Sequence, residues 1–403
     1  MDDRWNSPFP YTLAYNLFKQ HITELNSIYW SFVPVSNTIK KAAKSALKTD
    51  DVDPKTYFLI QDKDDRRMAP TYGEWKSNFR SFENYTRLNM VMLISSCFET
   101  YLRTVISHAF ESKPGVIIMC PDSVDGVFLL KNRTGYGNTN SKDYQFSNQI
   151  DEICRGDWEK RFSAFKKYFG SLPSSVTDNT IQLNELRVTR NNVGHYLGRK
   201  KTDYETPIFF APLAAMDISH DRVLKYFKLV NDVAKNLDKY LKDNIIGSYD
   251  IIKYYFQEIS AGNFDSGHPG QRARDLQRCL GRAGLPSVGN EYYRNIVGFC
   301  DLDAASDNCR YSAKACINEI NRKLSERNIS IMRDGHNIRF SRYHFRLFIK
   351  VYKWRTNPDY CQTNPNNIDQ LEYCYSMRVI DFIVDEISKN PGAIIQSLQA
   401  AIN

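Results

Sequence analysis

Apolar residues recur at steps of three and four along most of the chain, and this spacing predicts a mainly helical protein. The longest such pattern runs from about Gly73 to Glu111, where Lys113-Pro114-Gly115 ends it. The first pattern lies between Pro10 and Asn37 and is bounded by Pro34. In all, we expect helices over about residues 10–37, 73–111, 148–170, 183–197, 217–244, 312–327, 368–389 and 392–402.

Polar stretches interrupt this pattern and predict the connections. Lys48 to Arg67 is polar and charged, which predicts a loop with one strand-like segment at Tyr57 to Ile60. Cys120 to Phe146 is rich in Gly, Asn, Ser, Asp and Lys, so we expect a long loop there, either functional or a surface excursion. Gly262 to Gly270 is the best linker candidate in the chain.

One short stretch predicts β-structure. Ile329 to Met332 and Asn337 to Phe340 flank the sequence Arg333-Asp334-Gly335-His336. Asp-Gly between two such segments is a strong hairpin signal. A helix followed by a basic hairpin is either a winged-helix arrangement, which binds nucleic acid, or a structural hairpin that caps a helical domain.

The length of the chain predicts two domains, because 403 residues exceed one ordinary hydrophobic core. We expect a bundle of four or five helices over residues 1–247, including an N-terminal helical extension. A helix and linker follow over residues 248–270. Residues 271–403 then form a smaller, basic and mainly helical domain that contains the hairpin, so the fold class is mostly α.

Composition narrows the class of protein. The chain is 42% hydrophobic and 25% charged, and no apolar run is long enough to span a bilayer. Residues 1–5 lack the basic and apolar regions of a signal peptide, so we expect neither membrane insertion nor secretion. The nine cysteines form no CxxC pair. We therefore expect reduced thiols in a cytoplasmic protein, with no disulfide framework and no zinc site.

The positive charge is concentrated in one region. The formal net charge is +8, and Gln271 to Arg355 holds 17 Lys and Arg against 8 Asp and Glu. A basic surface attracts phosphate backbones without reading their sequence. The surplus therefore favours a nucleic-acid partner, although a solvated basic face remains the alternative.

The richest chemistry lies between Leu183 and Arg199. Leu183, Leu186, Val193 and Leu197 form one apolar stripe, Arg190 shares that stripe, and Gly198 ends the helix. Asn191 and His195 are an i, i+4 pair on a neighbouring face. Arginine suits a phosphate and histidine exchanges its proton near neutral pH, so this edge could hold and cleave a phosphodiester.

The spacing of Arg190 and His195 is not specific by itself. The pairs Arg103/His108 and Arg339/His344 have the same spacing. The setting of Arg190 and His195 differs, because a polar residue follows the arginine directly and a turn-rich stretch, residues 174–179, precedes the helix. A long upstream helix also carries a lone carboxylate, Glu99, near the edge of its inner face.

In this combination the region resembles the HEPN superfamily over about residues 75–245. The matching motif is Arg-polar-(x)3-His, here Arg190-Asn191-(Asn192-Val193-Gly194)-His195. The resemblance implies a helical, metal-independent endoribonuclease without a cofactor. It further implies a homodimer in which two such helices face each other, with products that carry a 2′,3′-cyclic phosphate and a 5′-hydroxyl.

The resemblance also implies roles for single residues. Arg190 would bind the scissile phosphate, His195 would act as general acid or base, and Asn191 would orient one of them. Glu99 would hold the Arg190 guanidinium, or alternatively form a surface i, i+4 ion pair with Arg103. Further RNA contacts are expected from the following residues: Lys131, Arg133, Lys142 and Arg199.

Two functions remain open at this point. The first is a HEPN-type endoribonuclease that serves as a toxin or antiviral defence effector. Some toxin members carry a tyrosine two residues after the histidine, where a partner modifies it, but here Tyr196 follows immediately and Leu197 takes that place. The second is a non-catalytic helical dimerisation module with a nucleic-acid-binding C-terminal domain, in which Arg190 and His195 are a buried polar pair.

Overall fold

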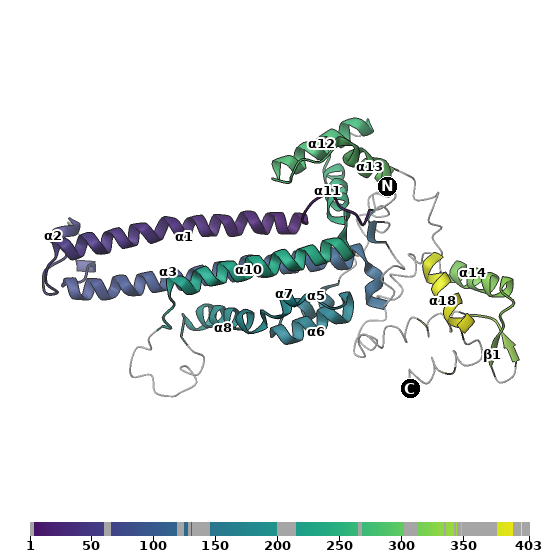
Figure 1. Ribbon diagram of the computed structural model, residues 1–403, viewed down its shortest axis with the longest axis horizontal. Coiled ribbons are helices and arrows are strands. Elements are labelled where there is room, and N and C mark those ends of the chain that lie inside the picture. The colour runs from purple at the N-terminus through teal and green to yellow at the C-terminus, as the bar shows by residue number, and fades with distance from the viewer. Residues whose placement is uncertain are drawn as a thin grey trace. The chain divides into compact units, whose positions relative to one another are not determined.

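The protein is mainly helical, as the sequence predicts. Figure 1 shows the computed structural model. It describes residues 4–59, 66–118, 125–127, 130, 146–199, 215–264, 268–301, 313–333, 336–341, 344, 348, 377–389 and 396. The chain folds into two compact units, each built from separate stretches of sequence. Unit 1 contains residues 1–13, 104–172 and 238–403, and unit 2 contains residues 14–103 and 173–237.

Unit 2 is a helical bundle. It is built from most of α1 (Leu13–Ala46), α3 (Tyr72–Ser112) and α10 (His220–Leu241), together with α8 (Thr180–Tyr196) and the short helices α2 (Lys55–Phe58) and α7 (Ser174–Thr177). Rings from α1 and α3 meet in the core, where the Phe18 and Tyr101 centroids are 5.1 Å apart. The Tyr101 hydroxyl donates to the Ala234 carbonyl of α10 at 3.0 Å. These contacts hold the three long helices together.

Helix α1 continues twelve residues past Pro34, which we expected to end it. Proline removes one backbone donor, but tertiary packing on both sides offsets that loss. Beyond the proline, Ser36 is buried and donates to the Glu83 carboxylate of α3, which also pairs with Lys40 at 2.7 Å. The expected end of this helix was therefore wrong.

The prediction of a strand-like segment at residues 57–60 was also wrong for the residues that the structure describes. Residues 55–58 form the single-turn helix α2, while Ile60 lies outside the described residues. The Phe58 ring packs on Trp75, with centroids 4.8 Å apart, beside a small core of Ala43, Leu47 and Tyr72. The apolar side chains of this loop serve that core and no sheet.

Unit 1 contains the remaining described elements. They are η2 (Pro114–Ile118), α5 (Ser147–Cys154), α6 (Trp158–Phe169), the π-helix η3 (Lys242–Ile246), α11 (Tyr249–Ser260), α12 (Pro269–Arg282), α13 (Asn290–Asp301), α14 (Ala313–Glu326), β1 (Ile331–Arg333), β2 (His336–Ile338) and α18 (Met377–Lys389). Where we expected one helix over 148–170 there are two. Gly156 takes a φ of 91° between them, and the Asp157 side chain then caps α6 by accepting from the Lys160 amide at 3.0 Å.

The predicted hairpin is confirmed. Strands β1 and β2 pair antiparallel, with Ile331 opposite Ile338. Helix α14 precedes the hairpin and packs against α18. The Asn321 side chain of α14 joins the two elements, because its amide donates to the Phe340 carbonyl at 2.8 Å and its oxygen accepts from the Phe340 amide at 3.0 Å. The expected helix over 392–402 and residues 368–376 lie outside the described residues, apart from Gln396.

A buried arginine anchors the N-terminal segment within unit 1. Arg4 is 3% exposed and forms an ion pair with Asp125 at 2.7 Å. Its guanidinium also donates to the Ser112 hydroxyl and carbonyl and to the Ile246 carbonyl. The guanidinium carbon lies 3.5 Å from the centre of the Trp5 ring. The Arg4 guanidinium is thus held by an ion pair, by hydrogen bonds and by contact with an aromatic ring.

The first turn of α1 is capped by carboxylates from distant parts of the chain. Asp238 accepts from the amide and hydroxyl of Thr12, and Asp250 accepts from the Leu13 amide at 2.7 Å. Both aspartates are buried. Because burial disfavours the charged form, the pKa of Asp250 rises to about 6. Helix α1 therefore depends for its cap on residues more than two hundred positions away.

No described helix combines the length and the apolar character that a membrane span requires. Cys97, Cys154, Cys279 and Cys300 form no disulfide.

Candidate active site

Helix α8 packs into unit 2 through three of the four residues of the predicted apolar stripe, whereas the fourth, Leu197, is 66% exposed beyond the end of the helix. Leu183, Leu186 and Val193 are each less than a tenth exposed. The helix ends after Tyr196, where Leu197 and Gly198 both take positive φ and the Gly198 amide donates to the Asn192 carbonyl at 2.9 Å. A Cβ on Gly198 would lie 2.8 Å from a Leu88 methyl group of α3. Glycine is therefore required here, as the expected helix end implied.

The Arg190 guanidinium is held from two sides. One terminal nitrogen lies 3.3 Å from the Glu99 carboxylate of α3, and the other donates to the Asn191 side-chain oxygen at 3.1 Å. The Glu99 and Arg190 side chains are each about a third exposed, at 33% and 31%. A guanidinium carries more N–H groups than these two contacts use. Arg190 is thus fixed in position and still reachable from solvent.

Glu99 makes the contact that the functional interpretation requires. Its carboxylate reaches Arg190 across 91 positions of sequence. The alternative interpretation was a surface i, i+4 ion pair between Glu99 and Arg103. The contact between Glu99 and Arg190 is present whether or not that second pair also forms. The carboxylate is therefore placed to orient the cation that would meet a phosphate.

His195 is exposed at the last turn of α8. No hydrogen bond ties its ring to another described residue, and Tyr196 lies beside it at a centroid distance of 6.2 Å. It follows Asn191 by one turn, so both side chains emerge from the same face of the helix. The buried polar pair of the non-catalytic alternative does not describe this imidazole, because solvent reaches it.

The other two Arg-(x)4-His pairs differ from this one. The Nδ1 atom of His108 is sealed from solvent and has no hydrogen-bond partner among the described residues. Burial and the nearby Lys253 ammonium lower the pKa of His108 to about 4. His344 is 5% exposed, and its Nδ1 accepts from the Ser341 amide at 3.0 Å. Of the three histidines, His195 is exposed, His108 is half-buried with its Nδ1 atom sealed, and His344 is buried.

Gly194 leaves open space beside the candidate site. A Cβ at this position would meet only the terminal methyl of Met92, at 3.8 Å, among the described residues. Packing inside the subunit therefore does not require glycine there. The residue lies on the exposed side of α8, directly before His195.

A polar network that sequence reasoning missed fixes α8 against α10. The Glu185 carboxylate pairs with Arg222 at 2.6 Å, and Arg222 also donates to the Tyr226 hydroxyl at 3.1 Å. That hydroxyl lies 3.4 Å from the Thr189 hydroxyl, one residue before Arg190. No sequence signal could have paired these groups, because both contacts between the two helices join residues 37 positions apart.

The expected RNA-contacting residues are only partly described. Lys131, Arg133 and Lys142 lie outside the described residues. Arg199 is partly buried, and one terminal nitrogen is 3.4 Å from the Leu197 carbonyl oxygen, just past the end of α8. Within the described part of the chain, no group of three or more His, Cys, Asp and Glu side chains could hold a metal ion.

Two family models match separate parts of the chain. Residues 60–243 match RiboL-PSP-HEPN, which spans the candidate site. Residues 304–399 match an EC042_2821-like Restriction Endonuclease-like domain. No curated protein and no solved structure matches the chain.

Proposed function

We propose that the chain is a metal-independent endoribonuclease, because residues 60–243 match a HEPN family model and HEPN domains are generally associated with RNase activity. One observation carries the proposal. A guanidinium held by Glu99 and Asn191 lies on the same helix as a solvent-exposed imidazole one turn further on. A fixed cation and a proton carrier are the two groups that phosphodiester transfer to a 2′-hydroxyl needs.

The proposed reaction uses these residues in one transfer. The His195 imidazole accepts the proton of a ribose 2′-hydroxyl, and the 2′-oxygen attacks the adjacent phosphorus. Arg190 donates to the phosphate oxygens and stabilises the negative charge that grows on them. The bond to the 5′-oxygen then breaks, and that oxygen takes a proton from an imidazolium, which leaves a 2′,3′-cyclic phosphate and a 5′-hydroxyl. Glu99 and Asn191 are positioning residues for Arg190.

The proposed enzyme is a homodimer in which two α8 helices face each other. Ile181, Asn184, Val188, Asn191 and His195 follow one another at steps of three and four, which is the spacing of a heptad seam. Ile181 is 72% exposed and Val188 is 48% exposed, so the two apolar side chains of this stripe face solvent in a single subunit. A second α8 stripe would cover both side chains and bring a second His195 to the cleft, where it supplies the proton for the leaving oxygen.

The biological role that we propose is that of a toxin or antiviral defence effector, in keeping with the resemblance to HEPN ribonucleases. Induced expression of the wild-type chain should slow growth or reduce phage yield, and the same chain with His195→Ala should do neither. Equal growth and equal phage yield with both chains would remove this role and leave the nuclease proposal intact.

Cleavage itself is tested with purified protein, total RNA and EDTA. We expect cleavage by the wild type and a loss of about two to three orders of magnitude in rate for Arg190→Ala and His195→Ala. Matched controls are Arg80→Ala and His21→Ala, which remove an exposed arginine from α3 and an exposed histidine from α1. The same weak background in all five proteins would reject the enzyme and favour the non-catalytic dimerisation module.

A further inference from the structure

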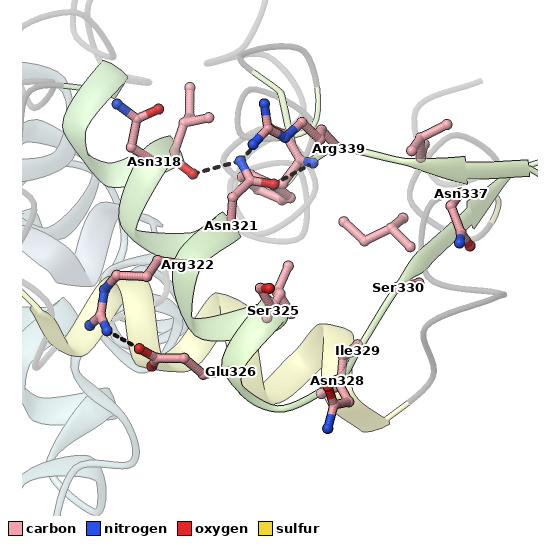
Figure 2. Close-up of a pocket in the computed structure, with 15 residues that line it drawn as sticks. Asn318, Asn321, Arg322, Ser325, Glu326, Asn328, Ile329, Ser330, Asn337 and Arg339 are labelled. Atoms are coloured by element: carbon pink, nitrogen blue, oxygen red, sulfur yellow. Dashed lines mark hydrogen bonds and ion pairs between the residues drawn. The ribbon is translucent and has the colours of Figure 1, made fainter.

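A concave surface lies far along the chain from α8, between α14 and the hairpin. It has a volume of about 1000 Å³ and is lined by α14, the connection that follows, residues of both strands and the two residues after β2 (Figure 2). In Figure 2, Asn318, Ser325 and Asn328 project from the helix side, while Ser330, Asn337 and Arg339 lie on the hairpin side. We call this surface the α14 groove.

The lining of the α14 groove combines six apolar residues with nine polar or charged ones, and several of the polar side chains are unpaired among the described residues. No side-chain hydrogen bond to a described residue is formed by the following lining residues: Asn318, Ser325, Asn328, Ser330 and Asn337. Asn321 differs, because both ends of its amide are used in joining α14 to Phe340. The groove therefore presents free amide and hydroxyl groups on a framework held by Asn321, and amides offer both donors and acceptors to a ligand.

The charges of the groove are unbalanced toward the positive. Glu326 is the one carboxylate in its lining, and Arg322 of α14 neutralises both it and Glu319. Outside the lining, Asp385 pairs with Arg327 at 2.6 Å. Arg339 lines the groove, is exposed and has no ion pair with any described residue. One free guanidinium thus lies among neutral hydrogen-bonding groups.

We propose that the α14 groove binds a single strand of nucleic acid. Arg339 contacts a backbone phosphate, and the free amides and hydroxyls contact base edges and sugars. A duplex is less suited, because it hides its base edges and is held mainly by several cations on successive phosphates, whereas the described lining supplies one unpaired cation. A basic peptide is also less suited, because the lining offers it no unpaired carboxylate.

The proposal assigns binding to the α14 groove and no cleavage step. Four carboxylates whose side chains are described in the segment that matches a restriction-endonuclease-like model form ion pairs with arginine or lysine, namely Glu319, Glu326, Asp385 and Glu386. The inference therefore goes beyond the proposed ribonuclease activity of α8 and stands whether or not that activity is found.

The test measures the affinity of the full chain for short labelled strands by fluorescence anisotropy. It uses the variant Arg190→Ala/His195→Ala as background, so that neither cleavage nor the α8 site affects the result. In that background we expect single-stranded RNA or DNA to bind more tightly than the duplex of the same sequence. Adding Arg339→Ala should weaken binding about tenfold, the effect of losing one charged hydrogen bond.

Salt dependence and a neutral variant locate the contact. Arg339→Ala should reduce the slope of log affinity against log salt by about 0.7, the value for one phosphate of a single strand. Asn337→Ala should weaken binding and leave that slope unchanged. The control Arg282→Ala removes an exposed arginine at the end of α12, outside the groove, and should change neither quantity. Equal thermal unfolding midpoints would show that the variants fold.

Several results would overturn the proposal. They are equal affinity for strand and duplex, binding that Arg339→Ala does not change, and equal losses for Arg339→Ala and Arg282→Ala. Full competition by an acidic peptide of the same charge would show a site for acidic protein segments instead. Tighter binding of RNA than of DNA would identify the 2′-hydroxyl as a contact, and equal binding would place the contacts on phosphate and bases.

Discussion

Arg190 and Arg4 are both paired with carboxylates, yet they differ in how far their guanidinium groups are exposed to solvent. Arg4 is 3% exposed and spends its donors on Asp125, Ser112 and the Ile246 carbonyl. Arg190 is 31% exposed and keeps donors free beyond its contacts with Glu99 and Asn191. The exposed fraction of the side chain, and not the residue type, separates the arginine that can meet a substrate from the one that holds the fold.

The histidines repeat this contrast. His108 and His195 both follow an arginine by five positions. The ring nitrogen Nδ1 of His108 is buried without a partner, and the pKa of the ring falls to about 4, so it stays neutral at ordinary pH. His195 is exposed at the end of α8. The same spacing on two helices therefore gives one candidate proton carrier and one structural residue.

The largest expected effect is on stability, from Arg4→Ala. Arg4 is 3% exposed but Asp125 is 36% exposed, so the main loss falls on the buried Ser112 and Ile246 carbonyls, and the free energy of unfolding should fall by about 1–3 kcal/mol for each of them left without its donor. Denaturant unfolding measures it. Arg190→Ala should change the same quantity by less than about 1 kcal/mol, because its pair with Glu99 is a third exposed. A similar loss of stability in both variants would break the comparison.

The second effect is the pH dependence of stability due to His108. Because its folded pKa lies below the unfolded value of 6.5, the stability that neutral His108 contributes is present above pH 6.5 and is lost as pH falls toward 4. Each pKa unit corresponds to about 1.4 kcal/mol. His108→Gln should remove this part of the acid sensitivity, and urea unfolding at a series of pH values measures the difference from wild type.

Asp250 acts in the opposite direction and serves as the internal check on that series. Its folded pKa of about 6 lies above the ordinary value of 3.8, so its contribution is present below pH 3.8 and is lost as pH rises through 6. His108→Gln leaves this trend in place. Identical pH profiles for wild type and His108→Gln would show that the histidine is not buried as described.

The third effect tests Glu99 as a positioning residue. Glu99→Gln keeps an oxygen acceptor but removes the charge that holds Arg190, so kcat should fall about tenfold to a hundredfold while KM changes less. Initial rates on a defined RNA measure both constants. Glu74→Gln, at an exposed position early in α3, is the matched control and should leave both constants unchanged. An unaltered kcat for Glu99→Gln would assign the pair to surface structure.

The smallest energetic effect concerns Gly194. Inside one subunit a Cβ meets only a Met92 methyl group at 3.8 Å, so Gly194→Ala should raise the free energy of unfolding of the monomer by up to about 1 kcal/mol through helix propensity. If two α8 helices pack closely at this point, the same change should weaken the dimer and lower the cleavage rate. Analytical ultracentrifugation and the RNA assay measure the two outcomes. Unchanged dimer and rate would place the dimer contact elsewhere.

The regular helices could be predicted from the sequence, because their apolar spacing and stop signals are local. The long helix expected over 73–111 is observed over Tyr72–Ser112, with Lys113 and Pro114 at its end. The break at Gly156 was missed because inward-facing aromatic positions continue past it, from Trp158 to Tyr168. At Pro34 the error was the reverse, because we expected the helix to end and it continues. The contact of Ser36 with Glu83, which supports α1 beyond the proline, joins residues 47 positions apart and leaves no local signal.

The candidate site was predictable only in part, for the same reason. Arg190, Asn191 and His195 lie within one helix, so their shared edge follows from helical geometry. The contact of Arg190 with Glu99 was expected only through the resemblance to a family, because nothing local relates the two helices. The tie between Thr189 and Tyr226 had no such guide and was missed.

The cap of α1 has a practical consequence for anyone who shortens the chain. Residues 4–13 bring the donors that Asp238 and Asp250 accept, and they carry Arg4 to its pocket beside Ser112. A truncation at Leu13 would therefore leave two buried carboxylates without these donors and leave the first turn of α1 without its cap. Affinity tags belong ahead of Arg4, and a start codon placed later would yield a destabilised protein whose lost activity says nothing about α8.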